Sequence, residues 1–341
     1  MRSRVSLWCA IALGLTLAGP VLRAHGQEAA YEQEPIDYLK APVNDPVARL
    51  QKRIEARTVT LAHDGRHGYL EAVLQALDVD PASQVLVFSK TSFQRDRITP
   101  KAPRALYFND SVYVGWVQSG DVLELSAVDP QQGAVFYLLD QSPTEKPAFQ
   151  RYTHDCLQCH ASGKTRDVPG HLVRSVFPLR SGQPAYNAGT FTTSHESPLS
   201  ERWGGWYVTG THGAMTHMGN VFVTDADNPE KLDTAAGANV TDLSGRLAID
   251  HYLRPTSDIV ALMVLEHQTQ TQNLDVPASN VGEALEELAR RCPALAGTVI
   301  LGRTIHPAYR LSINGDRFET DPEARLGEGD SLLLLAADVG G

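Results

Sequence analysis

The chain has 341 residues, 42% of them hydrophobic and 21% charged, which is enough apolar material for one large domain or two smaller ones. Its formal net charge of −10 excludes nucleic acid as an expected partner, because a polyphosphate backbone would be repelled. Only four cysteines are present, which excludes a small secreted scaffold held together by disulfides.

The N-terminal segment has the pattern of an export signal. Arg2 and Arg4 precede a mostly apolar run over residues 5–18, and small residues lie just before Gln27. This order predicts a secretory signal peptide at residues 1–26; a membrane anchor is the alternative, but the run is short for a bilayer span. Cleavage would change the formal charge from −10 to −13, because the segment carries three arginines and no acid. We therefore expect a periplasmic or secreted protein of bacterial-type export, with no stable membrane insertion afterwards.

Two helices and then a series of strands are predicted in the first half of the chain. Asn44-Asp45-Pro46 offers a helix cap and a first-turn proline, so a helix should run from there to about Arg57. A second apolar stripe predicts a helix over residues 68–77. Short segments rich in β-branched and aromatic residues then predict strands over residues 85–88, 105–108, 112–117, 122–127 and 134–139.

The motif with the clearest chemistry is Cys156-Leu157-Gln158-Cys159-His160. Two cysteine thiols at this spacing can add across the two vinyl groups of a porphyrin, and the histidine that follows can bind iron. The motif resembles the attachment sequence of c-type cytochromes. That resemblance implies one covalent haem c, with Cys156 and Cys159 as the thioether donors and His160 as the proximal axial ligand. It covers the motif and its immediate surroundings, so the fold of small cytochromes is not carried over.

Two other uses of a close cysteine pair fit less well. A structural zinc site needs further ligands, usually a second close pair, and the sequence has none. A thioredoxin-type redox pair opens a helix directly after a strand in a βαβ unit, whereas Lys146-Pro147 and residues 151–154 precede this motif.

The chain after the motif contains short strands, a late helix and several candidates for a sixth iron ligand. Strands are predicted over residues 172–177, 185–191, 203–209 and 220–224. A helix should begin near Pro255 and Ser257 and run to about Gln270, with Ile259, Val260, Met263 and His267 along one face.

The glycine- and tryptophan-rich segment over residues 203–220 supplies the first candidates for that ligand. We rank His217 and Met218 first, then His212, then His171, which returns to the motif in a local loop. The alternative is a turn segment whose histidines and methionine are simply packed. Met263 and His267 of the late helix are further candidates. Arginines that could pair with haem propionates are Arg151, Arg166 and Arg174, although ordinary surface positions are the simpler interpretation.

The last seventy residues have a different pattern. A strand over residues 274–277, a helix over 281–291, a strand over 308–313 before Asn314-Gly315, and a strand over 331–336 are predicted, and the chain ends at Gly340-Gly341. The helix, the Asn-Gly turn, the Gly-Asp before the last strand and the terminal Gly-Gly resemble the ubiquitin-like β-grasp sulfur carriers, such as the small subunit of molybdopterin synthase. The resemblance implies a partial β-grasp module with an activatable C-terminal glycine. Export removes the chain from ATP, so we expect Gly341 not to be thiocarboxylated.

Taken together, the sequence predicts an α+β protein with a strand-rich haem-binding domain containing short helices, followed by a partial β-grasp module. The predicted segments are a signal peptide over 1–26, a haem domain over 27–271 and the C-terminal module over 272–341. Single-electron transfer to an unspecified redox protein is the expected function. A peroxidase-like haem enzyme with an open sixth position is one alternative, and a carrier or interaction protein that uses its Gly-Gly tail is the other.

Overall fold

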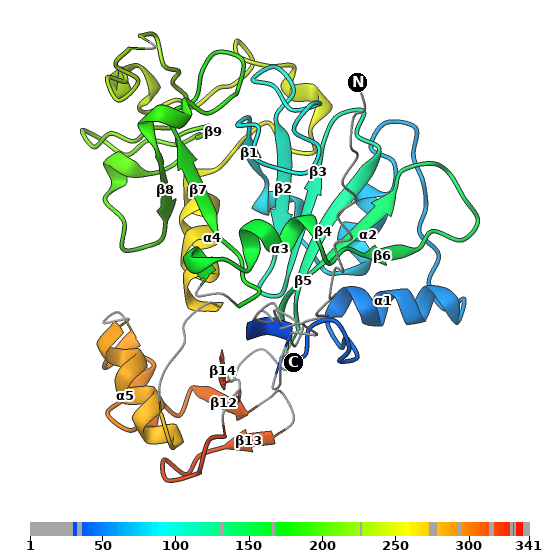
Figure 1. Ribbon diagram of the computed structural model, residues 1–341, viewed down its shortest axis with the longest axis vertical. Coiled ribbons are helices and arrows are strands. Elements are labelled where there is room, and N and C mark those ends of the chain that lie inside the picture. The colour runs from blue at the N-terminus through cyan, green and yellow to red at the C-terminus, as the bar shows by residue number, and fades with distance from the viewer. Residues whose placement is uncertain are drawn as a thin grey trace, which may run out of the picture.

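The protein has the α+β fold that its sequence predicts (Figure 1). The computed structural model describes residues 30–32, 36–129, 132–165, 168–225, 227–272, 278–291, 295–313, 317–327, 330 and 332–336. The signal segment, Cys292, Gly340 and Gly341 lie outside these residues, as does the predicted strand over 274–277.

A seven-stranded antiparallel sheet forms the centre of the molecule. Five of its strands follow one another in sequence as hairpin-connected neighbours, so most of the pairing is local. The short β9 closes the far edge beside β1. In spatial order the strands are β6 (Phe149–Arg151), β5 (Gly133–Asp140), β4 (Val122–Asp129), β3 (Val112–Trp116), β2 (Arg104–Phe108), β1 (Val85–Val87) and β9 (Trp206–Tyr207).

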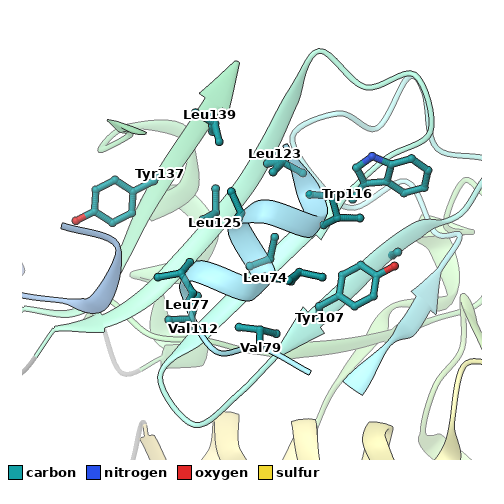
Figure 2. Packing of buried hydrophobic residues seen from close by; sticks show 14 of the residues in the cluster. Leu74, Leu77, Val79, Tyr107, Val112, Trp116, Leu123, Leu125, Tyr137 and Leu139 are labelled. Atoms are coloured by element: carbon teal, nitrogen blue, oxygen red, sulfur yellow. The ribbon is translucent and has the colours of Figure 1, made fainter. Parts of the chain in front are cut away.

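One face of this sheet packs against α1 (Pro46–Glu55) and α2 (Leu70–Ala76). The helix cap predicted at Asp45 is confirmed, since its carboxylate accepts hydrogen bonds from the backbone N–H groups of Val47 and Ala48 at 2.8 and 3.0 Å. Figure 2 shows α2 lying on the strands, with Leu74 directed into the layer of sheet residues. Each fully buried leucine contributes about 2 kcal/mol of hydrophobic free energy, so this layer anchors the sheet. Sheet residues on this face include Tyr107, Trp116, Leu123, Leu125, Tyr137 and Leu139.

The opposite face carries the elements that follow the sheet in sequence. Because side chains alternate along a strand, Glu124 and Ser126 of β4 point away from the layer that contains Leu123 and Leu125. A two-stranded ribbon of β7 (Val173–Val176) and β8 (Thr190–Thr193) and the helix α4 (Ile259–Gln272) lie on this side. The short helix α3 (Asp155–His160) crosses in front of the middle strands (Figure 1).

Several predicted elements differ from the structure. Residues 220–224 form no strand, and the predicted strand over 185–191 is a turn of 3-10 helix followed by the start of β8. Of the residues predicted to share one face of α4, Val260 is 62% and Met263 48% exposed, whereas Leu262 and Leu265 are buried. This helix is apolar on several sides, so periodicity could not identify the face that packs. Turns of 3-10 helix are found at 30–32, 81–83, 163–165, 186–188, 199–201, 234–237 and 249–251.

The C-terminal residues pack around a hydrophobic cluster of their own. The helix α5 (Val281–Arg291) contributes Val281 and Leu285, which meet Ile300, Leu311 and Ile313 from the strands. The helix over 281–291 and the strands near 308–313 and 331–336 are confirmed. The β-grasp relationship itself stays a prediction. The strands are the hairpin β10 (Ile300–Leu301) and β11 (Thr304–Ile305), and an antiparallel sheet ordered β13 (Arg317–Glu319), β12 (Tyr309–Ile313) and β14 (Leu332–Ala336).

Across the described ranges, none of the helices is long and apolar enough to cross a membrane.

Candidate functional site

The helix α3 places the three residues of the motif on little more than one turn. Cys156 and Cys159 are three residues apart and His160 is four from Cys156, so all three share one side of the helix. Leu157 anchors the helix, since its side chain is 4% exposed and packs against the main core. Both thiols are free, with Cys156 half-buried and Cys159 exposed. Two thiols and one imidazole are thus presented together.

The imidazole of His160 is oriented by the backbone ten residues later. Its Nδ1 lies 2.9 Å from the carbonyl oxygen of Gly170. A carbonyl only accepts, so Nδ1 carries the proton and donates, which leaves the lone pair on Nε2. Burial lowers the pKa of His160, so the ring is neutral at pH 7. The ring of Phe136 lies against it, with 4.8 Å between ring centroids. This is the form of histidine that binds a metal through Nε2.

The loop between His160 and Gly170 is closed by bonds to one carbonyl. The carbonyl oxygen of His160 accepts from the N–H of Gly170 at 2.8 Å and from the hydroxyl of Thr165 at 3.1 Å. Thr165 is 1% exposed, and its Oγ1 also accepts from the N–H of Ser162 at 3.0 Å. These bonds hold the carbonyl of Gly170 where the imidazole of His160 can reach it.

A partly buried ion pair lies beside the helix on the same face of the sheet. Arg104 of β2 and Glu124 of β4 are 3.0 Å apart, and their side chains are 19% and 12% exposed. Both charges act on His160, whose pKa Arg104 lowers and Glu124 raises. The guanidinium occupies the space over Gly115 of β3, where a Cβ would lie 2.2 Å from Nη2. Its Nε is buried without a hydrogen-bond partner among the described residues.

The thiol of Cys156 is a poor redox nucleophile. Burial and then the negative charge of Glu124 raise its pKa to about 12, although Arg104 acts in the other direction. Reactive thiols of dithiol oxidoreductases have lowered pKa values. A strand, β6, does precede α3, which the sequence did not indicate, but the next strand β7 pairs antiparallel with β8 and forms no βαβ unit.

Of the sixth-ligand candidates, His171 lies nearest to the motif by shared contacts. Its ring is 6% exposed and lies 6.2 Å from the ring of Phe136, the same ring that His160 contacts. It also lies 4.3 Å from Tyr113, and its Nε2 is 2.6 Å from the hydroxyl of Ser126. The structure therefore brings together His160 and His171 around Phe136.

The other three candidates lie in a second region. His217 is 1% exposed and packs beside Trp203 and His212, at 5.2 and 4.8 Å between ring centroids. Its Nδ1 accepts from the N–H of Gly219 at 3.0 Å, and burial lowers its pKa to about 4.

Both remaining side chains also have partners there. The Nε2 of His212 accepts from the N–H of Asn239 at 3.1 Å. Met218 packs in a cluster with Phe177 and Val223, where its sulfur lies 3.7 Å from the hydroxyl of Ser175. The lone pairs on His212 Nε2 and His217 Nδ1 therefore accept hydrogen bonds from backbone N–H groups.

The three arginines considered as partners of haem propionates differ in their surroundings. Arg151 donates to the carbonyl of Tyr38 and to Gln132, both at 2.5 Å, and lies over the ring of Tyr38. Arg174 is half-buried on β7, with its Nε buried and without a partner among the described residues. Arg166 lies outside the described residues.

A group of potential metal ligands occurs at the start of α2. Asp64, His67 and Glu71 offer atoms within 4.8 Å of one another. The imidazole of His67 is already bonded on both sides, 3.1 Å from Glu71 and 3.1 Å from the carbonyl of His251. These contacts account for the buried ring without a metal ion.

In comparisons with known proteins, no family model, curated protein or solved structure matches this chain.

Sequence reasoning missed the residues that surround the motif. Arg104, Gly115 and Glu124 lie on three different strands and come together only through the register of the sheet, in which Gly115 pairs with Glu124. The sequence held only a weak signal for them: Arg104 lies one residue before the strand predicted over 105–108, and Gly115 interrupts the run predicted over 112–117.

Proposed function

We propose that this protein holds one covalent haem c at α3 and that its function is single-electron transfer. Cys156 and Cys159 would carry the thioether bonds, and His160 would be the proximal ligand. A bound haem supplies reversible one-electron chemistry at its iron. The observation that carries the proposal is the hydrogen bond from His160 Nδ1 to the carbonyl of Gly170, on the same helical turn as the two thiols.

This bond supports the proposal because it sets both the tautomer and the direction of the ring. Histidines that bind metals almost always donate their second ring N–H to a carbonyl, a carboxylate or water. The lowered pKa keeps His160 neutral, so no proton has to leave Nε2 before it can bind iron. The raised pKa of Cys156 argues against a dithiol oxidoreductase at the same residues.

The Arg104–Glu124 pair is also consistent with a bound haem. A buried guanidinium with an unpartnered Nε is a donor to an anionic oxygen, and arginine binds carboxylates through two parallel hydrogen bonds. Haem carries two propionate carboxylates. Arg104 is therefore a candidate to hold one of them, and Gly115 leaves the room that the guanidinium occupies.

The proposal is tested by haem retention. The mature chain, produced with a haem-attachment system and exported, should keep its haem after denaturation and acid–organic extraction. Cys156→Ala and Cys159→Ala should each lose or weaken that retention. Cys292→Ala is the matched control, since it removes a cysteine outside the motif, and it should retain the haem. Full release of haem from the wild-type chain would refute the proposal.

The sixth position separates electron transfer from a second candidate function. The lone pairs of His212 and His217 accept backbone hydrogen bonds, and His171 contacts Ser126. These contacts favour a haem with an open sixth position, which could activate a small oxidant such as peroxide.

Optical spectra of the single variants distinguish the two functions. A change from low-spin to high-spin iron in Met218→Ala, His217→Ala, His212→Ala or His171→Ala identifies a sixth ligand and supports electron transfer. A high-spin wild-type protein that binds carbon monoxide readily supports the peroxidase-like alternative. The sequence ranks His217 and Met218 first, then His212, then His171. Of these four residues, His171 is the one that shares a ring contact with His160, through Phe136, so His171→Ala is the first variant to measure.

The C-terminal Gly-Gly stays a separate proposal. We expect Gly341 to carry no thiocarboxylate in the exported protein, because acyl-adenylate formation needs ATP. Intact mass spectrometry tests this directly: a mass shift of one sulfur replacing one oxygen at Gly341 would show that the tail is used as a carrier.

A further inference from the structure

A cavity of about 490 Å³ lies away from α3, at the end of the sheet formed by β1 and β9. Its volume falls within the range of roughly 300–1,000 Å³ that is typical of small-molecule sites. The residues that line it come from five separate parts of the chain, so only the folded protein contains it: Thr99, Pro100, Lys101, Arg180, Ser181, Tyr207, Phe222 and Arg246.

The charge of this cavity is opposite to that of the whole chain. Lys101, Arg180 and Arg246 are three of its lining residues, and the described lining includes no aspartate or glutamate. The protein as a whole has a formal charge of −10. Three cations around one small cavity repel each other, and an anion bound between them would relieve that repulsion.

The cationic groups keep donors for a ligand. Within the described ranges Arg180 forms no ion pair or side-chain hydrogen bond, and it is exposed at the rim. Lys101 uses one contact, 2.6 Å from Nζ to the carbonyl of Arg246, and an ammonium has three donors. The half-buried Arg246 donates from Nη1 to the carbonyl of Asn220 at 2.7 Å, which fixes its guanidinium and leaves other N–H groups.

Two of the other lining residues, Tyr207 and Phe222, are aromatic. Tyr207 is 2% exposed and its hydroxyl donates to the carbonyl of Pro100 at 2.7 Å, so the hydroxyl is satisfied within the wall. Phe222 packs on Phe88 with 5.1 Å between ring centroids, and Phe88 packs on Tyr207 at 4.8 Å. These three rings pack on one another at tilted angles and give the cavity an apolar side beside its cationic residues.

We propose that this cavity is a binding site for a small organic dianion with a flat, apolar body, such as an aromatic dicarboxylate. The guanidinium groups would bind the acidic groups through paired hydrogen bonds, and the aromatic wall would pack on the body. The proposal is independent of the haem motif, because none of its lining residues belongs to α3 or to the loop that orients His160.

Calorimetric titration of the full mature chain tests the site with three anions: the dianions phthalate and succinate, and the more highly charged pyrophosphate. Phthalamide, the uncharged relative of phthalate, is the ligand control. We expect saturable binding of phthalate, weaker binding of succinate and pyrophosphate because they lack an aromatic ring, and no binding of phthalamide. Raising the salt concentration should weaken phthalate binding.

Variants then assign the binding to the cavity. Arg180→Ala should raise the phthalate dissociation constant about tenfold or more, and Arg180→Glu should abolish binding, since a charge-assisted hydrogen bond is lost or reversed. Arg180 is exposed, so neither change threatens folding. Arg53→Ala on α1 is the matched control, because it removes another exposed arginine without affecting the cavity. Absence of saturable binding for all three anions, or binding that Arg180→Glu leaves unchanged, would overturn the proposal.

Discussion

The Nδ1 of His160 and the carbonyl oxygen of Gly170 lie 2.9 Å apart, and this contact sets the orientation of the only histidine in the cysteine motif. The loop that separates them is short and closes back on the carbonyl of His160 itself. The tautomer and orientation of the imidazole therefore depend on Gly170 as well as on the motif.

The loop should lose stability when the hydroxyl of Thr165 is removed. Thr165→Val deletes the hydrogen bonds to the carbonyls of His160 and Ser162 and leaves a buried carbonyl with one donor fewer. We expect a loss of about 1–2 kcal/mol in the free energy of unfolding. Thr165→Ser retains the hydroxyl and should cost less. Urea unfolding of both variants measures the difference, and equal stabilities would show that the hydroxyl contributes nothing.

The two thiols of α3 should differ in reactivity. At pH 8 a thiol with a pKa of about 12 is ionised to the extent of about one part in ten thousand, so Cys156 should react slowly with iodoacetamide. Cys159 is exposed and should react first. Peptide mass spectrometry after brief alkylation of the haem-free chain separates the two. Preferential labelling of Cys156 would contradict its raised pKa and would favour a dithiol oxidoreductase.

The Arg104–Glu124 pair should show strong coupling. Arg104→Leu leaves the carboxylate of Glu124 buried without its cation and should cost about 3 kcal/mol in the free energy of unfolding. The double variant Arg104→Leu with Glu124→Leu removes both charges and should recover part of that loss. A double-mutant cycle in denaturant measures the coupling; additive effects would mean that the two charges do not act as a pair.

His217 should make the protein less stable in mild acid. Burial, and then the neighbouring His212, lower its pKa from 6.5 to about 4 in the folded state. Below pH 6.5 the unfolded chain therefore binds a proton that the folded chain does not. Its contribution to stability is complete above pH 6.5 and is lost as the pH falls to about 4, by up to about 1.4 kcal/mol per pH unit.

The free energy of unfolding measured from pH 7.5 to 4 tests this. His217→Phe should flatten the curve in that window, whereas His306→Phe should not, since His306 is an exposed histidine of the C-terminal module. A wild-type slope that His217→Phe leaves intact would assign the acid sensitivity to other groups.

Much of the local structure could be predicted from residues that are close together in the chain. Asp45 and Pro46 predicted where α1 begins, and alternating β-branched and aromatic residues predicted the strands β1 to β5. The spacing of Cys156, Cys159 and His160 is also evident in the sequence. In α3 this spacing places the three residues on one side of the helix. These features depend on residues close together in the chain, so pattern and propensity are sufficient.

Contacts between residues that are far apart in the chain depend on how the strands and helices pack. The placement of Arg104 and Glu124 beside His160 depends on the pairing of β2, β3 and β4, and a shift of one residue would turn Glu124 to the other face. The buried side of α4 could not be predicted, because the helix is apolar around most of its circumference. The cationic cavity is lined by residues from five separate parts of the chain, and its three cations belong to a chain whose formal net charge is −10. Such groupings arise from long-range packing, which no local pattern encodes.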